Sequence, residues 1–506
     1  MEGTRARRLA AAVAGVVAVA AGVGLGELAA GVVAPSASPI VVVGSGLVDA
    51  APGWAKHLVI DLFGTADKTV LIVTVGVVLV VAAAVAGLVE LRRPPIGSLI
   101  VAALGVVGVV AALTRHAASP LDAVPAIVAA LVALIGIRLL MRWIPTPGET
   151  ASAAGLTRRG FLGRAVGIGV VGALAAVGGI ALEAGGRTVA AARKALKLPT
   201  PATAVPAPPA GADFRIPDLA PIVTPNDAFY RIDTALQVPQ IDPETWRLEI
   251  TGMVDRKITL TWHELLALPL EESWTTLTCV SNVVGGDLIG NARWLGYPIR
   301  HLLERAGPAA GADMVLSTSQ DGFTASTPIE ALRDPARQAI LAVGMNGEPL
   351  PAEHGFPVRM VVPGLYGYVS ATKWVVKLEV TRYDKATAYW TREGWAERGP
   401  IKLESRIDVV RPSGDGMVAA GVAWHQHVGV RGVEVRIDDG EWRPAELSTP
   451  ISADTWVQWR LPWTAAKGRH TLAVRAIGAD GEVQTATTAD VLPDGATGYH
   501  TMQVTV

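Results

Sequence analysis

The sequence contains a single cysteine, Cys279, within Thr276-Leu-Thr-Cys-Val-Ser-Asn282, and Gly285-Gly286 follows shortly after. A thiolate is a good ligand for soft metal ions. Most isolated cysteines, however, are inert and pack as small apolar residues, and Cys279 taken alone favours that interpretation. The glycine pair and Asn282 favour a turn where the backbone closely approaches another group. One cysteine excludes an intrachain disulfide. It also excludes an all-cysteine zinc site, an iron–sulfur cluster or a thioether-linked haem built by this chain alone.

A second group of candidate residues lies further along the chain. His354 and Arg359 belong to the segment 345–359, and Lys373 follows. On the simpler interpretation this is a loop, an apolar strand and a surface cation. On the functional interpretation Arg359 and Lys373 face a phosphate, and nearby glycines let backbone N–H groups approach it. The pattern therefore indicates a candidate anion pocket.

Two further groups favour structural roles. His425 and His427 would point their imidazoles to one face of a strand, but two ligands without a third are more often surface residues. Several late tryptophans are more typical of a β-sandwich core than of a cofactor stack: Trp442, Trp456, Trp459 and Trp463.

These side chains must be positioned by folded elements, and residues 213–400 have the pattern of a mixed α+β domain. Alternating or apolar segments predict strands, and a capping box and a glycine stop predict short helices. The expected elements are strands at 246–250 and 375–380 and helices at 261–268 and 298–306.

Residues 401–506 predict only strands. The segment 433–437 meets Trp442 across the turn Asp439-Gly440, which is a hairpin signal. Further strands are expected at 456–461, 471–475 and 502–506, a spacing typical of a β-sandwich. We therefore predict a separate all-β domain.

The first 182 residues differ in composition and predict a membrane region. A spanning helix needs about 20 apolar residues, and five runs meet this requirement: 9–33, 70–89, 97–113, 123–141 and 160–182. Residues 183–212 are then a basic and proline-rich linker. The net charge of -1 gives no support for a nucleic-acid partner.

The arginines and lysines predict the orientation of these helices. They concentrate before the first run, between the second and third, and around the connection from the fourth to the fifth. Five crossings then place the N-terminus in the cytoplasm and everything after residue 183 outside it. The segment from Thr157 to Arg164 resembles a twin-arginine export signal, which is typical of domains that fold before export. The expected location is the cytoplasmic membrane, with several spans in the lipid bilayer.

Several ordered motifs together resemble the sulfite-oxidase family of molybdopterin-dependent oxidoreductases, in its membrane-anchored bacterial branch. The resemblance covers roughly residues 215–385 and rests on the Cys279 segment, 291–296, 345–351, 354–359 and Lys373-Trp374. It implies a sulfite-oxidase-type molybdopterin domain at 213–400. Residues 401–506 resemble the family's immunoglobulin-like C-terminal domain, which implies a homodimer.

The resemblance also implies roles for individual residues. Cys279 would be the catalytic thiolate ligand of molybdenum. The residues that would bind the pterin and its phosphate are Tyr230, Arg231, Ser319, His354, Arg359, Ser370 and Lys373. Two features depart from the family. Val283-Val284-Gly-Gly stands where the family has arginines, and Trp395 stands where our approximate register places its catalytic tyrosine.

The implied activity is oxygen-atom transfer to or from a small S- or N-containing substrate. No haem or iron–sulfur cluster is expected in this chain, so electrons would pass to an external partner or the quinone pool. The two departures favour a neutral S- or N-oxide over sulfite. Sulfite oxidation proper and a non-catalytic, membrane-anchored binding or scaffold protein remain as alternatives.

Overall fold

The computed structural model describes residues 2–34, 37–52, 55, 58–59, 62–63, 67–115, 118–144, 158–183, 186–414, 416–464 and 466–506. The chain forms two compact units. We call the first the helical unit; it comprises Met1–Ala191 with Ala235–Gln240. We call the second the sheet unit; it comprises Ala192–Thr234 with Ile241–Val506. The finer boundaries at residues 182, 212 and 400 remain predictions.

The helical unit consists of long apolar helices. Its elements are α1 (Glu2–Val33), α2 (Pro39–Ala50), α4 (Asp67–Arg92), α5 (Ile96–Leu113), η3 (Pro120–Asp122), α6 (Ala123–Arg142) and α7 (Arg158–Glu183). Among the described residues, five helices are long and apolar enough to cross a membrane: α1, α4, α5, α7, and α6 together with η3. This confirms the five predicted apolar helices. The twin-arginine motif begins at Thr157, which lies outside the described residues.

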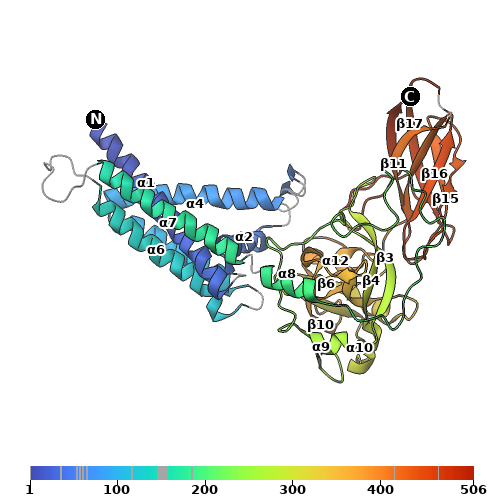
Figure 1. The fold of residues 1–506 in the computed structure, drawn as a ribbon, viewed down its shortest axis with the longest axis horizontal. Coiled ribbons are helices and arrows are strands. Elements are labelled where there is room, and N and C mark those ends of the chain that lie inside the picture. Colours follow the sequence, from blue (N-terminus) through green and yellow to red (C-terminus); the bar gives the residue numbers. More distant parts are fainter. Residues whose placement is uncertain are drawn as a thin grey trace. The chain divides into compact units, whose positions relative to one another are not determined.

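Helix α1 packs along α4, α6 and α7 (Figure 1). The contact is close because small residues face it: Ala11, Ala14 and Ala18 are completely buried. Small side chains at such positions let helix backbones approach one another, as in membrane helix bundles. The packing is therefore compatible with insertion into a membrane.

Two five-stranded sheets form the centre of the sheet unit. The short helix α8 (Gly186–Ala195) precedes them, and its last residues belong to this unit. The first has the order β2-β1-β10-β5-β6, and only β1 and β10 are parallel. Its strands are β1 (Arg247–Gly252), β2 (Ile258–Thr261), β5 (Met314–Ser319), β6 (Thr324–Pro328) and β10 (Val375–Thr381). The second has the order β3-β4-β7-β8, with β9 also paired to β7. Its strands are β3 (Glu271–Thr278), β4 (Ile289–Pro298), β7 (Ile340–Met345), β8 (Glu348–Pro349) and β9 (Arg359–Val361).

Short helices connect these strands. They are α9 (Trp262–Leu266), α10 (Ile299–Ala306), α11 (Ile329–Arg333), η4 (Ala352–His354), α12 (Gly367–Ser370) and α13 (Tyr389–Arg392). The capping box predicted at Thr261 and Glu264 is present. Helix α10 ends, as predicted, where Gly307 adopts a left-handed conformation with φ of 69°. The mixed α+β architecture is therefore confirmed.

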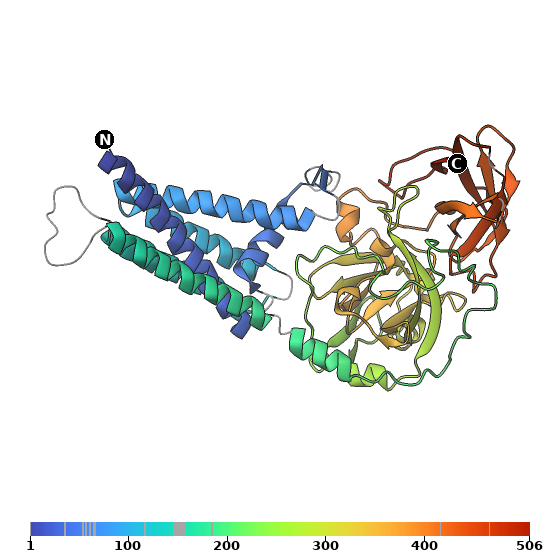
Figure 2. The ribbon, with the colours of Figure 1, turned by 45° about the horizontal axis from the view of Figure 1, so that its top comes forward.

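The last part of the sheet unit contains two four-stranded antiparallel sheets, coloured orange to red in Figure 2. One has the order β11-β12-β16-β15, from β11 (Glu404–Ser413), β12 (Gly416–Trp424), β15 (Glu446–Leu447) and β16 (Val457–Trp463). The other has the order β14-β13-β17-β18, from β13 (Val430–Ile437), β14 (Arg443–Pro444), β17 (Arg469–Gly478) and β18 (His500–Thr505). We call these the C-terminal sheets. The predicted hairpin is confirmed by the pairing of Val435 with Arg443.

The C-terminal sheets share a buried core of their own, to which Val435, Trp459 and Trp463 contribute. Trp456 belongs instead to the core of the central sheets. Trp442 is only partly buried, and the guanidinium groups of Arg436 and Arg475 lie over its ring. The prediction of sandwich-core tryptophans is thus confirmed for Trp459 and Trp463 and wrong for Trp442. Trp456 directly precedes β16 of the C-terminal sheets but packs in the core of the central sheets, so it lies where the two groups of sheets meet.

Candidate functional site

Cys279 is the first residue after β3, at the start of a tight loop that leads into β4. Its amide donates to the carbonyl of Leu288 at 2.9 Å, and its carbonyl accepts from Asn282 N at 3.1 Å. The Asn282 side-chain oxygen also accepts from Leu288 N at 2.8 Å. These bonds close the loop and fix the backbone that carries the thiol. We call residues 279–288 the cysteine loop.

The thiol of Cys279 is buried, with 8% of the residue exposed. Burial raises the pKa of this thiol above its usual range, because it disfavours the charged form. The nearby amide and hydroxyl of Ser281 and the ammonium of Lys373 lower the pKa in part. A metal ion would supply the remaining stabilisation that the thiolate needs.

A cluster of cations lies near this thiol. Arg359, the first residue of β9, is 5% exposed and stacks over the ring of Trp294 at 5.0 Å. Its guanidinium donates to the carbonyls of His354 at 3.2 Å, Met360 at 3.3 Å and Ala371 at 3.4 Å. Among the described residues Arg359 has no carboxylate partner, and burial lowers its pKa to about 10.

Lys373 lies between α12 and β10 and is 9% exposed. Its ammonium donates to Asp233 at 2.7 Å and to the carbonyl of Glu353 at 3.0 Å. Burial lowers the pKa of Lys373 to about 8, although Asp233 acts in the opposite direction. Asp233 also binds Arg231 at 2.9 Å, whose side chain is 40% exposed, so Arg231 lies at the rim of the cluster.

His354 and Tyr230 complete the cluster. His354 is 3% exposed, and its Nε2 lies 3.0 Å from the carbonyl of Asn226. Burial and the neighbouring cations Arg359 and Lys373 lower the pKa of His354 to about 4, so it is neutral at pH 7. Burial, and next the thiol of Cys279, raise the pKa of Tyr230 above its ordinary value.

A glycine allows the cation cluster to form. Gly355 has φ of 111°, a conformation that residues with a side chain rarely adopt. A Cβ at this position would lie 2.9 Å from Arg359 Cβ and 3.2 Å from Lys373 Cα. The loop can therefore approach both cations only because residue 355 is a glycine.

The two serines differ in their surroundings. Ser319, at the end of β5, is 1% exposed, and its hydroxyl has no hydrogen-bond partner among the described residues. The Ser370 hydroxyl donates instead to the carbonyls of Leu365 and Tyr366, both at 2.9 Å. Ser319 thus has a free hydroxyl for a ligand, whereas Ser370 holds its own turn together.

Loops next to the strands of the C-terminal sheets also hold β3, the strand that leads to Cys279. Gln426 Nε2 donates to Thr278 Oγ1 at 2.8 Å, and Trp456 N donates to Thr276 Oγ1 at 2.9 Å. Thr276 N in turn donates to the carbonyl of Asp454 at 3.0 Å. Thr276 and Thr278 are two residues apart, so both face the C-terminal sheets from one side of β3.

The far end of the cysteine loop is held from the same sheets. Arg406 donates to the carbonyl of Gly286 at 2.6 Å and pairs with Asp408 at 2.5 Å. The ring of His500 packs on Gly285, where a Cβ would lie 2.4 Å from it. The cysteine loop contains no arginine of its own, but Arg406 from β11 contacts it. Asp408 already balances the positive charge of Arg406.

The pair His425 and His427 does not share a strand face. Strand β12 ends at Trp424, and His427 adopts φ of 71°. His427 lies near Asp334 and Asp454, whereas His425 lies near Asp480 and Glu482. The expectation of two imidazoles on one face is wrong because the strand ends before both residues. His425 is also buried rather than on the surface.

The sequence motifs include Cys279 and the residues of the cation cluster but not several residues that hold them in place. Asp233 follows Arg231 by two residues, yet no motif marked it as the partner of Lys373. Gln426 and Arg406 lie far from Cys279 in the sequence, so no local pattern could connect them. Covariation between distant positions in related sequences is the signal that could have revealed these contacts.

The residues present fit a phosphorylated, metal-bearing cofactor. Within the part of the chain that the structure describes, the buried positive charge of Arg359 has no carboxylate partner, which suits a phosphate. The Ser319 hydroxyl and the Asn282 amide nitrogen are buried donors without partners among the described residues. Such groups cost free energy unless a ligand satisfies them. The buried thiol of Cys279 suits a soft metal.

Comparison with known proteins agrees with this class of site. The family model for the oxidoreductase molybdopterin binding domain matches residues 235–390. An uncharacterized oxidoreductase of Bacillus subtilis, YuiH, is 34% identical over 158 residues, which cover 31% of this chain and 76% of that protein. The chain belongs to the sulfite-oxidase-type family of molybdopterin oxidoreductases.

Longer relatives match in part. Mouse mitochondrial sulfite oxidase is 29% identical over 289 residues, covering 47% of this chain and 52% of that protein. The chain thus spans about half the length of the sulfite oxidases it matches. Soybean inducible nitrate reductase is 32% identical over 181 residues, which cover 30% of this chain and 20% of that protein. The sulfane dehydrogenase SoxCD of Paracoccus pantotrophus has a TM-score of 0.49 and 24% identity, over 56% of this chain and 81% of that chain.

Proposed function

We propose that this protein is a membrane-anchored, extracytoplasmic oxidoreductase that transfers an oxygen atom at a molybdenum–molybdopterin centre. The observation that carries the proposal is the buried thiol of Cys279 beside a buried cation cluster that includes Arg359 and Lys373. Cys279 would bind the metal, and the cations would bind the phosphate of the pterin. When bound, the molybdenum centre supplies two-electron redox chemistry coupled to oxygen-atom transfer.

The residues of the chain would hold this cofactor through separate groups. Arg359 offers a fork of donors, and Lys373 is a buried ammonium that Asp233 orients. His354 is neutral at pH 7 and can accept or donate a hydrogen bond. Ser319 offers a buried hydroxyl. Tyr230 lies near both the thiol of Cys279 and Arg359, and we propose that it lines the pterin.

Cys279 must lose its proton to bind a metal. Because burial raises the pKa of the free thiol, metal binding and deprotonation would occur together. The Ser281 amide and the Lys373 ammonium then stabilise the sulfur as an anion. The closed cysteine loop fixes its direction.

The surroundings of the cysteine loop favour a neutral substrate. Residues 280–289 contain no Lys, Arg or His. Arg406 contacts the loop, but it donates to a carbonyl and pairs with Asp408. A dianion such as sulfite would bring charge that these groups do not match, whereas a neutral sulfoxide or N-oxide carries no such desolvation cost. The second candidate is sulfite oxidation, which the sulfite oxidases among the relatives favour.

The five apolar helices and their charges support the membrane part of the proposal. The N-terminus would lie in the cytoplasm and the sheet unit outside, with electrons passing to an external partner or the quinone pool. A periplasm-dependent reporter fused after Val506 should be active. Changing both Arg158 and Arg159 to lysine should abolish that signal, and a reporter active only in the cytoplasm would contradict the orientation.

The C-terminal sheets would form an immunoglobulin-like domain that supports a homodimer. Their two antiparallel four-stranded sheets with a common core suit such a domain. Light scattering of the purified protein in detergent, with the detergent mass subtracted, measures the oligomeric state. A protein that remains monomeric at all concentrations would contradict the homodimer.

Metal and pterin analysis of the purified full chain tests the central proposal. We expect molybdenum near one atom per chain, and a protein without molybdenum or pterin when expressed with both available would contradict it. Steady-state assays on the molybdenum-replete enzyme then compare sulfite with neutral S- and N-oxides. A kcat/KM for sulfite well above that for every neutral oxide would favour the second candidate.

A further inference from the structure

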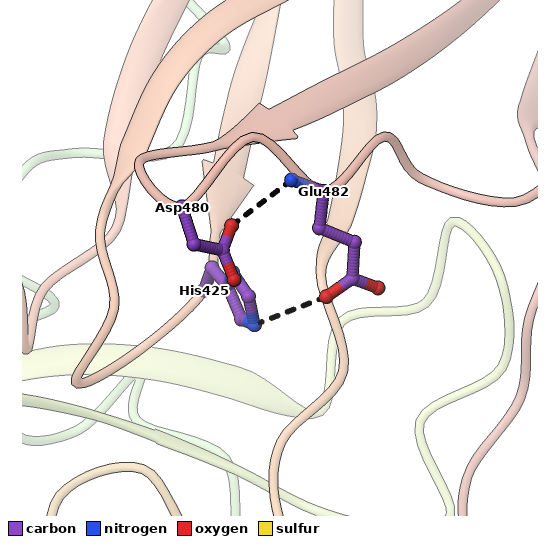
Figure 3. Close-up of side chains that lie close together, drawn as sticks. All are labelled: His425, Asp480 and Glu482. Carbon is purple, nitrogen blue, oxygen red and sulfur yellow. Dashed lines mark hydrogen bonds and ion pairs between the residues drawn. The ribbon is translucent and has the colours of Figure 1, made fainter.

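We propose that His425, Asp480 and Glu482 form a binding site for a divalent transition-metal cation such as Zn²⁺. One ligand atom from each residue lies within 4.8 Å of the other two (Figure 3). The three residues lie in loops that follow strands of the C-terminal sheets and take no part in the cation cluster near Cys279. The inference therefore does not depend on the proposed molybdenum chemistry.

Backbone hydrogen bonds hold the two segments that supply these ligands. His425 directly follows β12, and its carbonyl accepts from Gly429 N at 2.7 Å. Asp480 and Glu482 lie in a turn after β17, which Gly478 N closes by donating to the Glu482 carbonyl at 2.8 Å. Ala479 N donates to the Gly429 carbonyl at 3.0 Å and joins the two segments. The ligand positions are thus set by main-chain structure.

The imidazole of His425 indicates a missing ligand. The side chain is 9% exposed, and Nδ1 is buried without a hydrogen-bond partner among the described residues. Its Nε2 lies 3.9 Å from Glu482 Oε2, which is too long for a hydrogen bond. A buried polar atom without a partner destabilises the fold by about 1–3 kcal/mol. Such an atom in a native protein calls for an unseen partner.

The free nitrogen and a carboxylate border the same small space. A Cβ on Gly478 would lie 2.5 Å from Asp480 Oδ1 and 2.9 Å from His425 Nδ1. Because residue 478 has no side chain, this space stays open. Figure 3 shows the Asp480 carboxylate beside the His425 ring and the Glu482 carboxylate facing Nε2 of that ring.

The set of donors selects the type of ion. One imidazole nitrogen and two carboxylate oxygens suit Zn²⁺ and similar ions, whereas Ca²⁺ and Mg²⁺ prefer oxygen ligands alone. Two carboxylates also balance the charge of a divalent cation. A zinc ion with bonds of about 2.0–2.2 Å needs its ligands closer together than 4.8 Å. Asp480 and Glu482 are exposed and can move inward, while His425 is fixed.

Another histidine, at the opposite end of β17, provides the matched control. His470 also lies beside a carboxylate, with Nδ1 2.8 Å from Asp438. Its other nitrogen, Nε2, lies 2.9 Å from the carbonyl of Ala466. Both nitrogens of His470 therefore have partners already, so His470 and Asp438 should not bind the ion.

The test measures Zn²⁺ bound to the full chain in detergent by equilibrium dialysis and metal analysis. The parent carries Cys279→Ser, so that no thiol competes for zinc. We expect one Zn²⁺ per chain in the parent and its loss in His425→Ala. Asp480→Asn and Glu482→Gln should each weaken binding at least tenfold, and His470→Ala should leave it unchanged. Zinc should also raise the thermal midpoint of the parent but not of His425→Ala.

Asp480→Asn and Glu482→Gln change exposed side chains, so these two variants test the proposal even if His425→Ala folds poorly. Equal zinc binding in the parent, Asp480→Asn and Glu482→Gln would overturn the proposal, since zinc would then be adventitious. Binding of Ca²⁺ in preference to Zn²⁺ at these residues would also overturn it, because the imidazole would then have no role.

Discussion

The two sides of the candidate site are held in place by different means. The cations Arg359 and Lys373 and the imidazole of His354 come from one short stretch of chain, and their partners lie mostly in the same stretch. The thiol of Cys279 sits on a loop whose supports, Gln426 among them, come from the C-terminal sheets. One stretch of chain thus supplies the cations and the imidazole of the phosphate side, with Asp233 and Asn226 as distant partners, whereas the metal side depends on supports from the C-terminal part of the chain. Substitutions on each side should therefore separate cofactor retention from turnover.

The largest effect is expected at Cys279 itself. Cys279→Ser removes the metal ligand but leaves the cation cluster, so turnover should be lost while most of the pterin is retained. Charge-assisted contacts to phosphate contribute on the order of 1.5–3 kcal/mol each. Pterin fluorescence after denaturation, measured alongside activity, tests this. Activity that survives in the serine variant would remove Cys279 from the metal.

The opposite separation is expected at Arg359. Arg359→Met removes a buried cation from the phosphate side and should weaken pterin retention by roughly tenfold to a hundredfold. Arg359→Lys keeps the charge but loses the fork of donors, so its effect should be intermediate. The control is Arg293→Met, since Arg293 pairs with Glu272 at 3.5 Å. Full pterin content in Arg359→Met after extensive washing would place the phosphate elsewhere.

His354 gives the phosphate side a dependence on pH. Its pKa is lowered from 6.5 to about 4 in the folded protein, so the unfolded chain binds more protons between these values. The contribution of His354 to the free energy of unfolding is fully present above pH 6.5. It is lost, by up to about 3 kcal/mol, as the pH falls towards 4. Tryptophan fluorescence during thermal unfolding of the cofactor-free protein follows this loss.

The variant His354→Gln should show a smaller fall in thermal midpoint between pH 6.5 and 4 than the parent. His301→Gln, a change at a partly exposed residue of α10, should behave like the parent. Identical pH profiles for His354→Gln and the parent would show that another group causes the acid sensitivity.

The smallest effect is expected at Gln426, which supports the metal side from a distance. Gln426→Leu removes one buried hydrogen bond to Thr278, a loss of about 1 kcal/mol. Turnover per bound molybdenum should fall severalfold, and the molybdenum electron-paramagnetic-resonance signal should change. Gln458→Leu is the control, since Gln458 is equally buried but contacts Phe214 and Ala220. Equal turnover in both variants would limit Gln426 to stability.

The sequence was most informative where the determining interactions are local. The capping box at Thr261, the helix end at Gly307 and the hairpin at Asp439-Gly440 each depend on a few neighbouring residues. His425 and His427 show the opposite case, because the end of β12 decides where they point. The partners of the thiol and of Lys373 depend on tertiary contacts, which no local pattern encodes.

The packing of His500 on Gly285 has a consequence for the timing of biosynthesis. A ribosome makes Gly285 well before His500, so the nascent chain first presents the cysteine loop without its cover. At about 5–20 residues per second the interval is on the order of tens of seconds. Arg406, Gln426 and Trp456 are also synthesised after Gly285, so their bonds are absent at the start of this interval as well. The loop around Cys279 can reach its final form only after β18 has been synthesised and has folded.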